Sequence, residues 1–155
     1  MKIKQTSVAL ENKEGRLFEL TYLLMRNQID IRSFFVNEAA EFSGVHMILD
    51  KPDLALKVLK EKGYFVREVE VFALKADDRP GGLLKVLTVL KENGLNIEYV
   101  YGFGEKHEGK AIFVFRISDI DKAIEVIRSG LVESLDHDKV TGSRAASSWE
   151  LVDTL

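Results

Sequence analysis

Residues 76–97 read ADDRPGGLLKVLTVLKENGLNI, which predicts the end of a strand, a tight turn, an amphipathic helix and a second strand. Pro80 suits the first turn of a helix, because its missing N–H would have no intrahelical partner there. Gly81 and Gly82 allow a sharp turn and leave the helix N-terminus open to a ligand. Apolar residues then recur at helical spacing: Leu83, Val86, Leu87 and Leu90. Gly94 is a typical residue for ending such a helix.

The same pattern occurs earlier in the chain. Residues 12–17 (NKEGRL) and 27–31 (NQIDI) align with residues 78–83 and 93–97 at one constant offset, which indicates an internal duplication. Strands are predicted at residues 3–10, 29–36, 45–49, 65–76, 95–103, 111–117 and 131–135. Helices are predicted after the turn at 11–15, from 53 to 62, at 83–93 and after Asp119 or Asp121. Each half therefore has the order βαββαβ of a ferredoxin-like unit.

We expect an α+β fold of two such units, residues 1–68 and 69–140, in one continuous antiparallel sheet with the helices on one face. Within each unit we expect the central strand pair to be the exception to the antiparallel order. Residues 65–76 contain no turn residue, so one strand should end the first unit and begin the second. Residues 141–155 break the pattern and contain residue pairs that common cloning sites encode, which indicates a vector-derived tail. A native amphipathic helix around Trp149 is the alternative.

Composition excludes several classes of function. The formal net charge is −3 with acids and bases interspersed, so neither nucleic acid nor a membrane is an expected partner. The chain has no cysteine, hence no disulfide and no thiolate metal site. It shows no signal-peptide pattern at its start and no apolar run that could span a bilayer, so we expect a soluble, cytoplasmic protein. The group Glu105, His107 and Glu108 has metal-ligand chemistry, but its place on a predicted hairpin tip favours a solvated loop.

The turn and the strand that follows the helix resemble the signature of ACT domains, the small regulatory modules of amino-acid-pathway enzymes. The resemblance rests on Asp78-Arg79-Pro80-Gly81-Gly82-Leu83, Leu90 and Gly94-Leu95-Asn96-Ile97. With the duplication, the chain is similar to stand-alone tandem ACT proteins, which carry no catalytic domain. The resemblance implies that a free amino acid binds where the first strand–helix turn of one unit meets a neighbouring unit. It also implies a regulatory role without enzymatic activity and without a cofactor.

Carried over by position, the effector contacts of the resemblance fall on Asp78 and Asn96 in the second unit, and on Asn12, Gly15 and Asp30 in the first. Chemically, the carboxylate of Asp78 suits an ammonium group. The amides near Gly81 and Gly82 suit a carboxylate, and Arg79, Pro80 and Leu83 complete the turn.

The two sites are not expected to be equivalent, because Glu14 and Arg16 stand where the second unit has Pro80 and Gly82. Judged by spacing alone, the favoured interpretation is a structural one, in which Asp78 caps the helix and Asn96 shapes a turn. Tyr99 and Tyr101 alternate along a predicted strand, which more often means sheet packing than a pocket wall.

The resulting hypothesis is an allosteric amino-acid sensor in amino-acid metabolism that forms a homodimer and acts on a biosynthetic enzyme. A ferredoxin-like RNA-binding or protein-interaction module is the alternative, because residues 111–117 (AIFVFRI) carry strand aromatics. A small enzyme of the same fold is less favoured, because no Ser-His-Asp order, phosphate loop or carboxylate dyad occurs.

Overall fold

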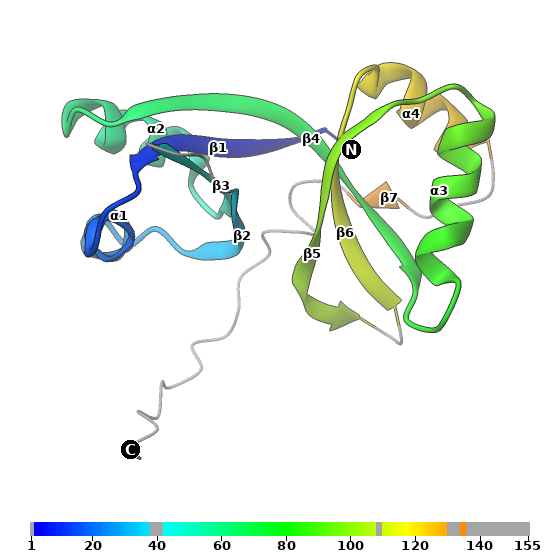
Figure 1. Ribbon diagram of the computed structural model, residues 1–155, viewed down its shortest axis with the longest axis horizontal. Coiled ribbons are helices and arrows are strands. Elements are labelled where there is room, and N and C mark those ends of the chain that lie inside the picture. The colour runs from blue at the N-terminus through cyan, green and yellow to red at the C-terminus, as the bar shows by residue number, and fades with distance from the viewer. Residues whose placement is uncertain (1, 38–41, 108–109, 130–133, 136–155) are drawn as a thin grey trace, which may run out of the picture.

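The computed structural model describes residues 2–37, 42–107, 110–129 and 134–135. The strands are β1 (Lys2–Glu11), β2 (Ile31–Asn37), β3 (Phe42–Leu49), β4 (Phe65–Asp77), β5 (Ile97–His107), β6 (Lys110–Ile117) and β7 (Ser134–Leu135). The helices are α1 (Arg16–Arg26), α2 (Pro52–Glu61), α3 (Gly82–Glu92) and α4 (Ile120–Arg128). Figure 1 shows the two units side by side, with β4 running through both of them.

Strand β4 is the covalent and structural link between the units. The sheet order is β2-β3-β1-β4-β6-β5, and β7 also pairs with β4. The first part of β4 pairs with β1 from Phe65 to Phe72, and its second part pairs with β6 from Phe72 to Asp77. The prediction of one shared strand is therefore confirmed, and the change of partner takes place at Phe72.

The expectation of a parallel central pair is wrong. The central strands β1 and β3 are antiparallel, like each of the other pairings in the described residues. The reason is the connectivity: the crossover through α1 leaves β2 parallel to β1, and the hairpin between β2 and β3 then reverses the chain. Strand β3 consequently lies beside β1 in the opposite direction.

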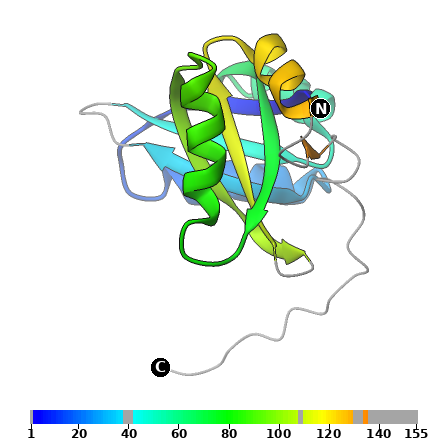
Figure 2. The same ribbon diagram turned by 90° about the vertical axis from the view of Figure 1, so that its right-hand side faces the viewer.

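The four helices cover one face of the sheet, as expected, and each unit has its own core beneath them. In the first unit α1 and α2 pack on the core that contains Leu20, Leu24 and Leu59. In the second unit α3 and α4 pack on the core that contains Val86, Leu90 and Phe115. Figure 2 shows α3 and α4 lying over the strands of the second unit.

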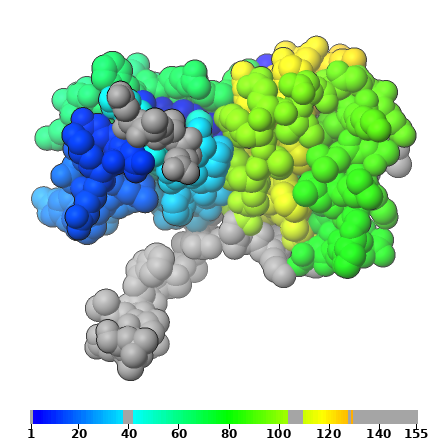
Figure 3. Space-filling view, viewed as in Figure 1, coloured from blue at the N-terminus to red at the C-terminus, as the bar shows by residue number. Residues whose placement is uncertain are grey.

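A third core occupies the other face of the sheet and joins the two units. It contains Ile3, Ile48, Val71, Ala73, Tyr101, Phe103, Ile112 and Val114. Side chains alternate along β4, so Phe72 and Leu74 point to the helices while Val71 and Ala73 point into this third core. The sheet is therefore curled, and the helix-free faces of the two units pack on each other. Figure 3 shows the resulting contact between the units.

The element boundaries differ from the prediction at two strands. Strand β5 continues to His107 with a register shift after Phe103, where a loop was predicted from residue 104. Strand β3 begins at Phe42 instead of residue 45. The cap of α4 is confirmed, because the Asp119 carboxylate accepts a hydrogen bond of 3.0 Å from the Lys122 N–H. Among the described residues, no helix is long and apolar enough to cross a bilayer.

Candidate functional site

The turn between β4 and α3 requires both of its glycines, for different reasons. Gly81 has φ +85°, in the left-handed region that side chains disfavour. A Cβ on Gly82 would lie 1.9 Å from the carbonyl oxygen of Asp77, so no side chain fits there. Two backbone hydrogen bonds close the turn, from the Arg79 N–H to Asp77 and from the Gly82 N–H to Arg79, both 2.9 Å. The sharp turn predicted from the sequence is confirmed.

The turn is open to solvent at the start of α3. Asp78, Arg79, Pro80 and Gly81 are exposed, and Leu83 is half-buried and packs on the second-unit core. The N-cap residue is Gly81, which has no side chain to cap the helix. By helix geometry, the N–H groups of the next residues have no intrahelical acceptor. They face the region where the helix dipole favours an anion.

Asp77 organises the charges around this turn. Its carboxylate accepts from Lys110 Nζ at 2.5 Å and from Arg79 Nη2 at 3.0 Å, with Lys85 Nζ at 3.9 Å. Lys110, and then Arg79, hold the pKa of Asp77 down at about 2. Sequence analysis did not select Asp77; its position as the last strand residue before the turn was the available signal. The described contacts of Asp77 thus bring three cations, Lys110, Arg79 and Lys85, to the start of α3.

The first unit repeats the backbone of this turn with different side chains. Gly15 has φ +81° and is the N-cap of α1. The Arg16 N–H reaches the Lys13 carbonyl at 3.3 Å. The Arg16 side chain then forms ion pairs across the helix start, with Glu19 at 2.6 Å and Glu11 at 3.6 Å. This turn is therefore more acidic than its counterpart and is partly covered by Arg16.

Within one chain, the structure does not bring Asp78 and Asn96 together. The Asn96 carbonyl accepts from the Ser118 N–H at 3.0 Å, just beyond the C-terminal end of β6. Asp77 contacts Lys110 at the N-terminal end of the same strand. Strand β6 has 8 residues, so its ends lie about 25 Å apart at roughly 3.3 Å per residue. One small ligand cannot touch both residues of the same copy.

The first-unit residues are separated in the same way. Asp30 precedes β2 and donates its N–H to Asp50 at 2.8 Å, while its carboxylate accepts from Arg32 at 3.0 Å. Asn12 follows Glu11, which pairs with the first residue of β3, whereas Asp50 follows the last residue of that strand. Asn12 and Asp30 therefore also lie at opposite ends of one strand.

A cavity that sequence analysis did not identify lies on the inner face of the sheet. It has a volume of about 700 Å³, and both units contribute to its lining. Tyr99 was predicted from the sequence to be a residue of sheet packing, and no lining residue of this cavity was predicted to bind a ligand. A sign of the cavity in the sequence is that the polar residues Gln5 and Ser7 alternate along β1 with the same period as Ile3. All three side chains therefore lie on the inner face of the sheet.

Two of the alternatives are not supported. Phe113 and Phe115 of β6 belong to the core beneath α3 and α4, so this strand offers no exposed stacking surface for RNA bases. No group of three potential ligands for a metal ion occurs among the described residues. The side chains of Glu105, His107 and Glu108 lie outside the described part of the structure, as does the tail from residue 136.

Comparison with known proteins gives a family and several similar structures. A family model described as an ACT domain pair matches residues 1–141.

Protein BT0572 from Bacteroides thetaiotaomicron is 36% identical with a TM-score of 0.86, covering 92% of this chain and 98% of that chain. The ligand-free regulatory subunit of aspartate kinase from Thermus thermophilus has a TM-score of 0.58 at 13% identity, covering 81% of this chain and 91% of that chain. The corresponding subunit from Thermus flavus has a TM-score of 0.55 at 10% identity, with coverage of 81% and 90%. The two kinase subunits show likeness of fold alone, and no curated protein matched.

Proposed function

Because this chain belongs to the ACT domain pair family, we propose that it is a regulatory protein that binds a free amino acid without turning it over. The observation that carries the proposal is the glycine turn at the start of α3, whose exposed N-cap, Gly81, has no side chain to cover the first turn of the helix. The regulatory character follows from the family, and the amino acid is our inference from the chemistry of the turn.

The turn offers complementary groups to both ends of an amino acid. The N–H groups of the first turn of α3 that follow Gly82, with Arg79 and Lys85 nearby, suit the carboxylate. The exposed carboxylate of Asp78 suits the ammonium group. In the first unit, the Arg16 ion pairs already occupy the corresponding helix start. We therefore assign the main site to the second unit and a weaker one to Asn12 and Gly15.

Asn96 and Asp30 are assigned a role that depends on a second copy. Each lies too far from the turn of its own unit to share a ligand with it, as the spacing along β6 and β3 requires. Each is exposed just before an edge strand, where the turn of another copy can approach. In this arrangement the effector bridges two chains and favours one of their relative positions, which a partner enzyme of amino-acid biosynthesis would sense.

A homodimer is supported by the surface of the first unit. Exposed apolar side chains gather on α1 and β2: Leu17, Phe18, Tyr22, Met25, Phe34 and Val36. Phe18 is 70% exposed and stacks on Tyr22 with ring centroids 6.0 Å apart. Strand β2 is also an edge of the sheet. A large apolar surface beside an unpaired edge is typical of a protein interface.

A thermal-shift screen across the common amino acids tests this function. Ligand at about a hundred times its dissociation constant adds roughly 2.7 kcal/mol to the free energy of unfolding. That corresponds to an increase of about 5–10 °C in Tm for a chain of this size. We expect one amino acid, or a few similar ones, to raise Tm and Asp78→Ala to remove most of the rise. A screen without any stabilising amino acid would contradict the proposal.

A further inference from the structure

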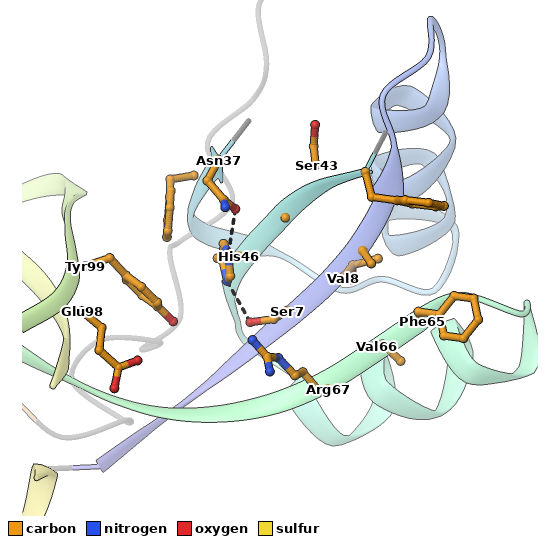
Figure 4. A pocket seen from close by; sticks show the side chains of 14 residues that line it. Ser7, Val8, Asn37, Ser43, His46, Phe65, Val66, Arg67, Glu98 and Tyr99 are labelled. Atoms are coloured by element: carbon orange, nitrogen blue, oxygen red, sulfur yellow. Dashed lines mark hydrogen bonds between the residues drawn. The ribbon is translucent and has the colours of Figure 1, made fainter. Parts of the chain in front are cut away.

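The inner-face cavity is large enough for a small molecule and combines residues of both units. Its volume of about 700 Å³ lies within the usual range for ligand pockets. Strands β1 to β4 line one side, and Glu98 and Tyr99 of β5 line the other. Figure 4 shows Tyr99 and Glu98 facing Ser7, His46 and Arg67 across this space. The cavity is distinct from the turn at the start of α3, none of whose residues lines it.

A directed hydrogen-bond chain forms the polar floor of the cavity. His46 Nε2 is 3.0 Å from the carboxamide oxygen of Asn37, which can only accept, so Nε2 carries the proton. His46 Nδ1 then accepts from the Ser7 hydroxyl at 2.9 Å. The Gln5 amide donates to Ser7 at 3.0 Å and to the Tyr99 hydroxyl at 2.7 Å. Tyr101 completes the chain by donating to the Gln5 carbonyl oxygen at 3.0 Å.

This chain leaves one hydroxyl proton without an acceptor. Tyr99 accepts from Gln5 through its oxygen, and no described residue accepts the proton that Tyr99 itself carries. Tyr99 is half-buried at the cavity wall. Its hydroxyl is therefore a donor directed by Gln5 and available to a ligand.

The charges at the cavity favour an anion. Arg67 of β4 turns its guanidinium group toward Ser7 (Figure 4), and no carboxylate of the described residues lies within ion-pair distance of it. Arg67 lines the cavity together with His46 and Tyr99, and burial, followed by the positive charge of Arg67, lowers the pKa of His46. The acid at the cavity, Glu98, already pairs with Arg116 at 3.3 Å. Among the described lining residues, Arg67 is thus a cation without a carboxylate partner, whereas the charge of Glu98 is paired with Arg116.

Aromatic rings form the wall beside these donors. The Phe35 ring stacks on the His46 ring with centroids 4.6 Å apart and planes 14° apart. The ring centroid of Tyr99 lies 5.4 Å from that of Phe35 and 5.3 Å from that of His46. Such a wall suits a flat ring, because offset and tilted ring contacts add to the gain from burying apolar surface.

Gly44 shows that the floor has no room for a larger side chain. A Cβ at this position would lie 2.2 Å from the Asn37 carboxamide oxygen and 2.9 Å from His46 Nε2. Glycine therefore preserves the contact that fixes the tautomer of His46, and with it the direction of the whole chain of hydrogen bonds.

We propose that this cavity binds a small aromatic carboxylate without an ammonium group, with its carboxylate at Arg67 and Tyr99 and its ring against Phe35 and Tyr99. The pairing of the lining acid Glu98 with Arg116, beside an Arg67 that has no carboxylate partner among the described residues, distinguishes this ligand from the amino acid expected at the turn. The fold then carries two binding sites of different chemistry, one at the start of α3 and one between the units.

Titration of the full chain with benzoate at pH 7.5 tests the proposal, followed by calorimetry and by the ring signals of His46 in NMR spectra. We expect saturable binding that shifts the His46 signals. Benzyl alcohol, which lacks the charge, and cyclohexanecarboxylate, which lacks the flat ring, should bind about tenfold more weakly or worse. Equal binding of benzoate and either analogue would overturn the assigned chemistry, and absence of saturable benzoate binding would overturn the site.

Matched variants locate the binding. Arg67→Gln and Tyr99→Phe should each weaken benzoate binding, Arg67→Gln by about tenfold or more, since a charge-assisted hydrogen bond is lost. Arg26→Gln removes an exposed arginine at the end of α1 and should leave the affinity unchanged. Asp78→Ala should also leave it unchanged, which separates this proposal from the amino-acid site. Benzoate binding that depends on Asp78, or that survives Arg67→Gln intact, would show that the cavity is not the site.

Discussion

At the scale of single residues, Gly81 and Gly82 give a test of the turn. Gly82→Ala places a Cβ against the Asp77 carbonyl, so the turn must open, and we expect a loss of about 1–3 kcal/mol in the free energy of unfolding. A Cβ at Gly81 would meet no atom within 4 Å, but the residue has φ +85°, which side chains disfavour. We therefore expect Gly81→Ala to lower the free energy of unfolding by about 1–2 kcal/mol. Gly102→Ala in β5 meets neither problem and serves as the control. Urea unfolding measures all three, and a Gly82→Ala variant as stable as the parent would rule out the close approach.

His46 predicts how stability depends on pH. Burial, and then the nearby Arg67, lower the pKa of His46 below its usual value. The unfolded chain therefore binds this proton more readily, so the contribution of His46 is complete above about pH 6.5 and is lost as pH falls from there toward the lowered native pKa. Asp77, with a pKa of about 2, stays ionised throughout this window. Urea unfolding at pH 7.5 and 5.5 should show lower stability at 5.5, and His46→Gln should reduce this difference.

At the scale of elements, β4 carries the connection between the units, and two phenylalanines in it test that role. Phe72 is 1% exposed at the point where β4 changes partner, so Phe72→Ala should lower the free energy of unfolding by about 3–5 kcal/mol. Phe65 is 80% exposed at the start of the same strand, so Phe65→Ala should stay within about 0.5 kcal/mol of the parent. Denaturant unfolding measures both changes. Equal effects of the two substitutions would contradict the burial of Phe72 at the point where the strand changes partner.

The elements also show what the sequence predicts and what it does not. The turns, caps and shared strand were predictable, because glycine, proline and an Asp119 cap act through local geometry. The inner core was not, because alternation along β1 does not reveal that Gln5 and Ser7 face a second unit. The separation of Asp78 from Asn96 was missed for a similar reason: spacing in the sequence does not say which end of β6 each residue occupies.

At the scale of the whole molecule, the exposed surface of α1 and β2 predicts a homodimer. Phe18→Asp places a charge in the middle of that surface and should shift the light-scattering mass to that of the monomer. Leu54→Asp, at an exposed position on α2 away from this surface and from the turn at the start of α3, should leave the dimer mass unchanged. A parent chain that stays monomeric at high concentration would end the dimer proposal. The amino-acid site would then consist of the turn alone.

Titration calorimetry measures directly whether the turn at the start of α3 binds a free amino acid. The amino acid selected by the thermal-shift screen is titrated into the parent, Asp78→Ala and Asn12→Ala proteins. We expect saturable heat with the parent, binding at least about tenfold weaker with Asp78→Ala, and a smaller change with Asn12→Ala. No heat with any common amino acid, or an Asp78→Ala variant that binds as tightly as the parent, would contradict this expectation.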